Sequence, residues 1–297
     1  MEKISIGYFA DGPWSHKAFE KIIKDETIEI KFIVPRTDST DDTLLKYSKE
    51  FNIPYHKGIK VNSDEFYELA NTYNCDLFVS MSFNQIFRNR IINLPRLKTI
   101  NCHAGKLPFY RGRNILNWAL INDEKEFGIT VHYIDEGIDT GDIILQRTFP
   151  ISNNDNYKTL LEVAFTECAN ILYDSIKKVQ KGNFIALKQN DIHPVGFYCG
   201  VRGPGDEIIN WNSTSREVFN FIRAICEPGP KATTYKNGIE VKVNKARMIL
   251  EAPTYINTTG QIIGKTNEGF LVKTKDTFLE ILEIDSDSKL RVGDKLG

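Results

Sequence analysis

Asn101 and His103 are the residues of this sequence best spaced to act together on a ligand. They lie at the end of a predicted strand, where residues i and i+2 project to the same face, so their side chains point the same way. An asparagine amide suits the stabilisation of a developing oxyanion, and a histidine moves a proton near neutral pH. The loop that follows adds three cations: Lys106, Arg111 and Arg113.

A second polar cluster lies at residues 135–142, which read Asp-Glu-Gly-Ile-Asp-Thr-Gly-Asp. Four of the eight side chains are carboxylates, and the two glycines permit a tight backbone path. Calcium is a poor alternative, because the spacing and terminal Glu of an EF-hand are absent. Singly, each feature also has a structural interpretation: a strand-end histidine, a solvated loop, an acidic turn, and packing roles for Trp14 and Phe83. The functional case therefore depends on their combination.

Several other kinds of site lose support because their motifs are missing. The sequence has no GxxxxGK[ST] loop, no GxGxxG after the first strand, no GxSxG, no HExxH and no CxxC. Its five cysteines are odd in number and widely spaced, so neither a disulfide framework nor a zinc site is expected. The sequence therefore predicts a site that holds no metal.

Charge and length place the chain among globular proteins. Its 297 residues include 38 Lys plus Arg and 39 Asp plus Glu, and this balance with 11% aromatics excludes disorder and disfavours a nucleic-acid partner. No apolar run approaches the ~18 residues of a membrane helix. The first residues lack a signal-peptide core, so we expect a cytoplasmic protein without membrane contact.

Strand and helix signals alternate through the first half of the chain. Strands are predicted at 4–9, 28–34, 77–81 and 97–102, and helices at 15–24 with Ser15 as N-cap, 40–50 and 63–71. This alternation predicts an α/β fold with a doubly wound, mostly parallel sheet. In such sheets ligands bind outside the carboxyl ends of the strands, which directs attention to the loops 10–15, 82–87, 103–113 and 136–142.

The second half predicts a separate, smaller domain. Strands at 128–134 and 142–149 and a long helix at 156–178 precede a glycine-rich stretch at 196–206, where we place the domain boundary. A helix from Ser213 to Cys226 and short strands separated by turns follow. The predicted domains are residues 1–200, which carry the chemistry, and residues 201–297, a helix linker with a small β-barrel-like domain.

The joint pattern resembles the formyltransferases that use N10-formyltetrahydrofolate. It consists of Asn-x-His at 101–103, Leu-Pro-x-x-Arg-Gly at 107–112 and Asp-x-Gly-x-Asp-Thr-Gly-Asp at 135–142. The resemblance spans residues 4–150 and extends weakly to Asp-Glu-Ile-Ile-Asn-Trp at 206–211. It implies a Rossmann-like formyltransferase domain and a catalytic trio of Asn101, His103 and Asp139, the last two separated by 36 positions.

The resemblance also implies where the folate binds and what the trio does. The pterin is expected between two loops, on Ser80, Met81, Ser82, Phe83 and Ile86 and on Ile138 and Asp142. Formyl transfer to an amine passes through a tetrahedral intermediate, so the oxyanion needs a donor and the amine must lose a proton. Asn101 suits the first need and His103 the second, and Asp139 can orient the imidazole, favour its charged form or hold a proton-relay water.

Three acceptors are known in the family, and charge separates them. Methionyl-tRNA enzymes usually carry a basic early insertion and a basic C-terminal domain. Here residues 35–50 are not basic, and residues 201–297 hold 14 Lys plus Arg against 13 Asp plus Glu. Glycinamide ribonucleotide enzymes are shorter and lack a C-terminal domain. We therefore expect a nucleotide-linked (UDP or dTDP) amino-deoxysugar, with methionyl-tRNA as the alternative and lipopolysaccharide or glycan biosynthesis as the setting.

The resemblance further suggests substrate contacts and an assembly. Lys106, Arg111 and Arg113 are expected to hold a diphosphate, or alternatively to salt-bridge the acidic turn. Trp14 or Tyr110 would contact the sugar or base, and family analogy favours a homodimer. Two other interpretations stay open: a non-catalytic folate-binding or regulatory protein, and a hydrolase that releases formate. The intact trio argues against the first, and the start of the chain directly at its first strand argues against the second.

Overall fold

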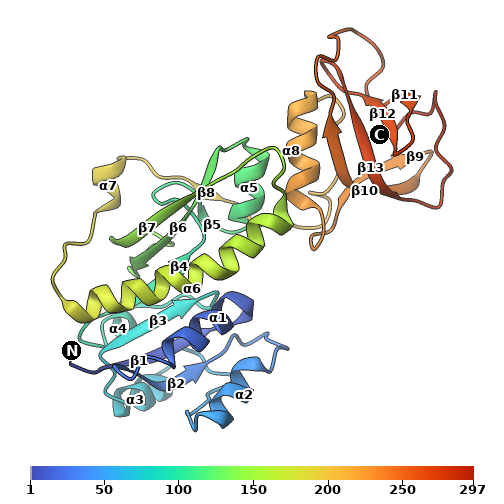
Figure 1. Cartoon of the computed structure of the whole chain (residues 1–297). Helices are drawn as coiled ribbons and strands as arrows, with labels where there is room; N and C mark the ends of the chain where they lie inside the picture. The colour runs from blue at the N-terminus through green and yellow to red at the C-terminus, as the bar shows by residue number, and fades with distance from the viewer. Residues whose placement is uncertain (1) are drawn as a thin grey trace. The chain divides into compact units, whose positions relative to one another are not determined.

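The computed structural model describes residues 2–297 and forms two compact units. Unit 1 comprises the residues up to Gly112 together with Phe127–Phe149 and Glu162–Tyr198. Unit 2 comprises Arg113–Glu126, Pro150–Leu161 and Cys199–Gly297. The two units are interleaved in the sequence, and each is described by itself below (Figure 1). Of the helices formed by residues 2–297, none combines the length and apolar character needed to cross a membrane.

Unit 1 is built on a six-stranded sheet in the order β2-β1-β3-β4-β6-β7 (Figure 1). The first four are parallel and β6 runs antiparallel to β4. This confirms the predicted α/β class with a mostly parallel sheet. The strands are β1 (Ile4–Ala10), β2 (Ile28–Val34), β3 (Leu77–Met81), β4 (Thr99–His103), β6 (Glu126–Tyr133) and β7 (Ile143–Pro150).

Helices cover both faces of this sheet. They are α1 (Gly12–Ile22), α2 (Thr43–Glu50), α3 (Asp64–Thr72), α4 (Asn89–Ile92), α6 (Tyr157–Lys181) and α7 (Gln189–Ile192). Successive strand residues point to opposite faces, and β1 uses this alternation. Tyr8 meets Phe19 of α1 on one face, whereas Phe9 meets Phe66 of α3 on the other.

The core on the α3 face is centred on one aromatic ring. Phe9 is fully buried, and its ring centroid lies within 6 Å of five other rings: Phe32, Phe66, Phe78, Phe83 and Phe87. All five contacts are edge-to-face, the geometry that the ring quadrupole favours. This cluster anchors β1 and β3, whose carboxyl ends lead into the candidate site.

Unit 2 contains two helices and a five-stranded antiparallel sheet in the order β11-β12-β13-β10-β9. The elements are α5 (Ile115–Ile121), α8 (Ser215–Ile225), β9 (Ala232–Lys236), β10 (Ile239–Met248), β11 (Ile262–Lys265), β12 (Phe270–Lys273) and β13 (Phe278–Asp285). A further short pair joins β5 (Arg111–Gly112) to β8 (Tyr198–Cys199).

Two predicted helix starts are wrong. The first helix begins at Gly12, not Ser15, because Asp11 accepts a hydrogen bond from the Gly12 N–H at 2.9 Å and caps it. Ser15 is buried inside α1, and its hydroxyl donates to the Gly12 carbonyl. Helix α8 begins after Thr214 rather than at Ser213, since Thr214 and Glu217 form a reciprocal capping box.

The aromatic core yields a stability prediction. Replacing Phe9 by Ala removes a ring packed against five others, so we expect the free energy of unfolding to fall by about 3–5 kcal/mol. Urea unfolding followed by circular dichroism measures the loss. Phe51→Ala is the matched control, because Phe51 is 42% exposed, and its loss should be below about 1 kcal/mol. Equal losses in the two variants would contradict the prediction.

Candidate active site

Strand β4 presents Asn101 and His103 on one face, as predicted, and strand β6 adds a partner. The antiparallel register places His132 opposite Asn101 and Thr130 opposite His103. His132 Nε2 lies 3.4 Å from the Asn101 amide nitrogen. The sequence analysis missed His132, although it stands two residues after Thr130 in a predicted strand. The i, i+2 rule that selected Asn101 and His103 selects this pair too.

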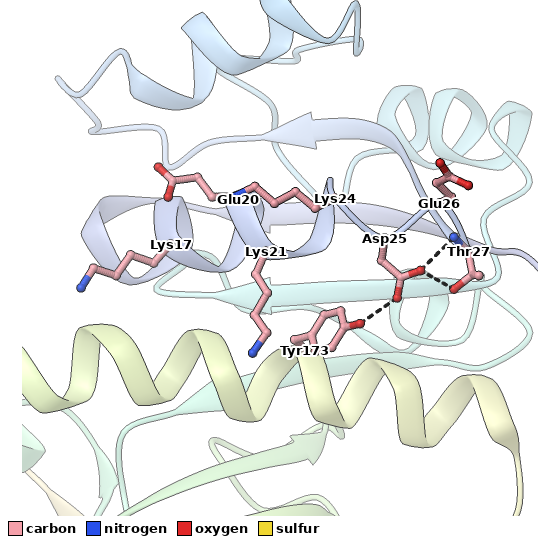
Figure 2. Close-up of a pocket in the computed structure, with 8 residues that line it drawn as sticks. All are labelled: Lys17, Glu20, Lys21, Lys24, Asp25, Glu26, Thr27 and Tyr173. Carbon is pink, nitrogen blue, oxygen red and sulfur yellow. Dashed lines mark hydrogen bonds between the residues drawn. The ribbon is translucent and has the colours of Figure 1, made fainter.

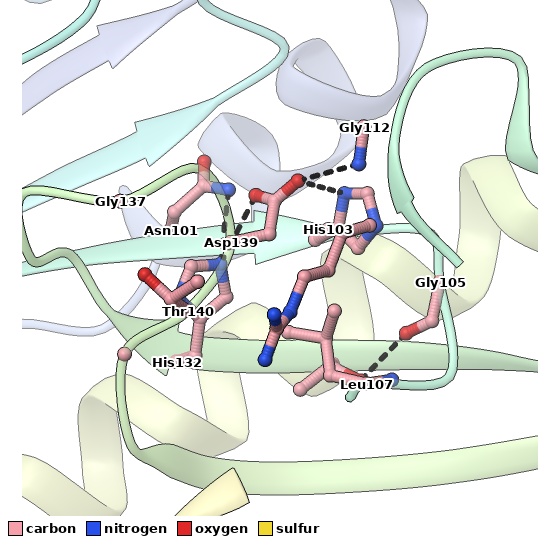
Figure 3. Close-up of polar contacts among 12 residues, drawn as sticks. Asn101, His103, Gly105, Leu107, Gly112, His132, Gly137, Asp139 and Thr140 are labelled. Atoms are coloured by element: carbon pink, nitrogen blue, oxygen red, sulfur yellow. Dashed lines mark hydrogen bonds and ion pairs between the residues drawn. The ribbon is translucent and has the colours of Figure 1, made fainter. Parts of the chain in front are cut away.

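Asp139 reaches the same place from the acidic turn (Figure 3). Its carboxylate lies between the two imidazoles, with Oδ2 at 3.6 Å from His103 Nδ1 and Oδ1 at 3.5 Å from His132 Nε2. The Gly112 N–H donates to Oδ2 at 3.0 Å. The structure therefore brings together all three residues of the predicted trio, with His132 as a fourth member.

The acidic turn at residues 135–142 does not follow the carboxyl end of a parallel strand, as the ligand-binding loops of such sheets do. Because β6 is antiparallel to β4, Tyr133 at its end pairs with Ile100 near the start of β4. The turn must fold back to bring Asp139 over His103. Asp139 does so with φ of +55°, a left-handed conformation that Asp tolerates better than most residues.

Hydrogen bonds to carbonyl oxygens orient both imidazoles. His103 Nε2 lies 2.7 Å from the Tyr110 carbonyl, and His132 Nδ1 lies 2.7 Å from the Tyr133 carbonyl. A carbonyl only accepts, so these two nitrogens carry hydrogen, and the opposite nitrogens face Asp139. His103 Nδ1 is therefore the ring nitrogen that faces the carboxylate.

Glycine at position 105 makes the His103 contact possible. A Cβ on Gly105 would stand 2.4 Å from both His103 Nε2 and the Tyr110 carbonyl oxygen. The Thr130 hydroxyl donates to the Gly105 carbonyl at 2.6 Å and holds this backbone in place. The absence of a side chain at position 105 thus lets the chain pass directly over the imidazole.

Asp139 is ionised at neutral pH. Burial by itself raises the pKa of Asp139, but the charges of His103 and His132 and the hydrogen bonds from His132 and the Gly112 N–H together outweigh it. They hold this pKa well below its usual value. The carboxylate is therefore a fixed negative charge between the two imidazole rings.

The predicted folate loops divide into core and exposed residues. Ser80 and Met81 are buried at the end of β3, and Phe83 packs its ring against Phe9 and Phe87. By contrast, 66% of Ile86 and 51% of Ile138 is exposed, so both present apolar surface. Ser82 and Asp142 are half-buried, and Asn89 of α4 contacts Glu136 of the acidic turn.

The predicted substrate residues are not all alike. Trp14 is half-buried and packs edge-to-face on Phe165 at 4.9 Å. Tyr110 is buried beside His103, and Lys106 is half-buried in the same loop. Arg111 hydrogen-bonds Gln189 rather than the carboxylates of the acidic turn. Arg113 is exposed and belongs to unit 2, where its N–H donates to the Cys199 carbonyl.

A hollow elsewhere in unit 1 lies between α1, the loop after it and α6 (Figure 2). Two of its charged side chains already have partners: Lys21 donates to Asn170, and Asp25 is bound by Thr27, Tyr173 and Lys177. None of the predicted site residues lines it. Among residues 2–297, no group of three or more His, Cys, Asp or Glu is arranged to hold a metal ion.

Comparison with family models decides the affiliation of the chain. Residues 10–175 match the model of the formyl transferase domain, and residues 203–293 match that of its C-terminal domain. The chain belongs to the formyl transferase family. The formyltransferase is 31% identical over 281 residues to methionyl-tRNA formyltransferase of Clostridioides difficile (strain 630), which covers 92% of this chain and 89% of the relative.

Two solved structures resemble the formyltransferase over almost its whole length, each at 25% identity. WlaRD, a sugar 3N-formyl transferase in the presence of dTDP and 5-N-formyl-THF, has a TM-score of 0.70 and covers 98% of this chain and 100% of its own. The N-formyltransferase from Helicobacter canadensis, in complex with folinic acid and dTDP-3-aminofucose, has a TM-score of 0.69, with coverages of 96% and 100%.

The close approach at Gly105 can be tested by adding one methyl group. Gly105→Ala should displace the His103 ring or the Tyr110 carbonyl, because its Cβ overlaps both. We expect kcat for formyl transfer to fall roughly 10–100-fold, the usual effect of misplacing a reacting group. Gly203→Ala is the control, since a Cβ there meets nothing within 4 Å and Gly203 does not have a left-handed backbone conformation. Full activity of Gly105→Ala would show that the Nε2 contact is dispensable.

The depressed pKa of Asp139 predicts a pH-dependent stability difference. Its folded pKa is below the unfolded value, so the carboxylate stabilises the fold above about pH 4 and loses this effect as pH falls toward the folded pKa. Asp139→Asn should therefore unfold more easily than the original protein at pH 7, by roughly 1–3 kcal/mol. The gap should narrow below pH 4 in urea titrations. A gap independent of pH would contradict the assignment.

Proposed function

We propose that this enzyme transfers a formyl group from N10-formyltetrahydrofolate to the amino group of a nucleotide-linked (UDP or dTDP) amino-deoxysugar. The observation that carries the proposal is the likeness, over nearly the whole chain, to two sugar N-formyltransferases crystallised with formyl-folates and dTDP compounds. These two likenesses cover 98% and 96% of this chain, whereas the likeness to glycinamide ribonucleotide transformylase 1 from Symbiobacterium toebii covers 63%.

The geometry around His103 suits the proton transfers of this reaction. The amine nitrogen attacks the formyl carbon, and the Asn101 amide donates to the oxyanion that forms. His103 Nδ1 takes the proton that the amine loses, and the fixed charge of Asp139 stabilises the resulting imidazolium. Collapse of the intermediate breaks the bond between the formyl carbon and N10, and the same proton passes to N10.

His132 and the two loops complete the proposed site. His132 lies against the Asn101 amide and Asp139, so it orients both groups rather than the substrate. The folate would lie between the loop that follows β3 and the acidic turn, against Ser80, Met81, Ser82, Ile86, Ile138 and Asp142. The exposed Ile86 and Ile138 side chains offer apolar faces for its ring. Phe83 would support this wall from the core.

The acceptor would be held on the other side of His103. Lys106 is the proposed contact for the diphosphate, and Tyr110 and Trp14 are those for the sugar or base. We also propose that the enzyme is a cytoplasmic homodimer. Its product would be used in the biosynthesis of lipopolysaccharide or another glycan.

Methionyl-tRNA is the second candidate acceptor, because curated relatives at 31% identity carry that name. Charge in unit 2 weighs against it. The cations along β10 pair with neighbouring carboxylates: Lys242 with Glu240, Lys245 with Glu283, and Arg247 with Glu268 and Glu280. Binding to tRNA depends on cations that neutralise phosphates, and paired cations serve this poorly.

A panel of acceptors tests the proposal. The enzyme is incubated with N10-formyltetrahydrofolate and UDP- or dTDP-linked amino sugars, and mass spectrometry detects replacement of an amine hydrogen by a formyl group. We expect at least one amino sugar to gain this group, and Asp139→Asn to abolish the gain. Formylation of methionyl-tRNA and of none of the sugars would replace the proposal with the second candidate.

A further inference from the structure

Gln189 is a buried residue that touches both the cationic loop and the acidic turn. It lies on α7, fifty residues from the turn in sequence, and only 3% of it is exposed. Its Oε1 accepts hydrogen bonds from Arg111 Nε at 3.1 Å and Nη2 at 2.6 Å. Its Nε2 donates to the carbonyls of Asp139 and Gly141, both at 2.8 Å.

The partners leave only one orientation for the amide of Gln189. A guanidinium only donates and a carbonyl only accepts, so Oε1 must face Arg111 and the NH2 group must face the turn. All four bonds have ordinary hydrogen-bond lengths. The side-chain amide of Gln189 thus hydrogen-bonds two segments that lie far apart in the sequence, through both its oxygen and its nitrogen.

Neighbouring residues pack closely around Arg111 and hold its side chain in position for this contact. Its guanidinium packs on Gly196, where a Cβ would stand 2.8 Å from Cζ and 2.9 Å from Nη1. The ring of Tyr198 lies 5.5 Å from the guanidinium carbon, and the Arg111 N–H donates to the Phe197 carbonyl. An arginine side chain seated so closely is held by the fold, unlike a mobile surface cation.

The backbone segment that Gln189 binds sets the direction of the Asp139 carboxylate. Asp139 adopts φ of +55°, a conformation that few side-chain-bearing residues adopt without support. Gln189 fixes the carbonyls on Asp139 itself and on Gly141, two residues later. Rotation of this short segment would swing the carboxylate away from His103 and His132.

We propose that Gln189 is a positioning residue that holds Asp139 against His103, and that Arg111 acts by orienting Gln189 rather than by binding the acceptor's diphosphate. This inference rests on the catalytic role proposed above for Asp139. It predicts that changes at Arg111 and Gln189 lower kcat and leave the KM of the acceptor unchanged. A diphosphate contact would do the opposite.

The substitution that tests the role of Gln189 most directly is Gln189→Glu. The carboxylate still accepts from Arg111, but its second oxygen now faces two carbonyl oxygens and cannot donate to them. We expect kcat to fall roughly 10–100-fold, with the acceptor KM within about twofold of the original. Gln180→Glu is the matched control, because Gln180 Nε2 also donates to two carbonyls, those of Glu2 and Thr27, and none of the site residues contacts it. The control should keep kcat within about twofold.

A double-mutant cycle tests the link between the two residues. If Arg111 acts through Gln189, the Arg111→Ala/Gln189→Ala double variant loses no more kcat than Gln189→Ala alone. Arg111→Lys, which keeps one donor for Oε1, should recover part of the loss of Arg111→Ala. Additive losses, or a raised acceptor KM with normal kcat in Arg111→Ala, would overturn the inference. Circular dichroism establishes whether each variant is folded. If an alanine variant does not fold, Gln189→Glu and Arg111→Lys replace it in the comparison.

The same assays separate this inference from the proposed function. The cycle is run with whichever acceptor the panel identifies, so a different acceptor leaves it intact. Near-normal kcat in Asp139→Asn would remove the proposed role of Asp139, and the role of Gln189 with it. An inactive Asp139→Asn beside a fully active Gln189→Glu would overturn only the inference about Gln189.

Discussion

The site depends on one carboxylate shared between two imidazoles. Asp139 lies between His103 and His132, and each ring keeps its other nitrogen on a backbone carbonyl. This arrangement sets the tautomers, keeps Asp139 ionised, and leaves His103 Nδ1 and His132 Nε2 facing the carboxylate. The left-handed backbone of Asp139 and the absence of a side chain at Gly105 follow from the same requirement, because both let the three polar groups approach closely.

The sheet supplies the geometry that this carboxylate needs. The parallel strands β1, β3 and β4 end at one edge and carry the loops that the doubly wound fold makes available to a ligand. The antiparallel strand β6 then places His132 opposite Asn101. The acidic turn returns over β4, and the buried amide of Gln189 holds its carbonyls. Parallel pairing thus positions the loops at the ends of β1, β3 and β4, and antiparallel pairing positions His132.

Much of this was predictable from local patterns. Short apolar runs and the helix signals between them predicted the strands of unit 1, and the spacing of two residues predicted that Asn101 and His103 share a face. Helix starts were less certain, because Asp11 and Ser15, and likewise Ser213 and Thr214, are competing N-caps, and only the local hydrogen bonds choose between them. The short helix α5 and the two-residue strands β5 and β8 carry too few residues to show a period.

The sequence by itself determined the fold class, the family resemblance and the three polar residues of the trio, because each depends on residue type and on spacing along the chain. Only the tertiary structure decided that His132 joins them and that Gln189 connects Arg111 to the turn. These contacts join residues about 30 to 80 positions apart, and their distances follow from strand order, register and the path of a turn. Local periodicity carries no information about such pairings, since many registers bury the same apolar face.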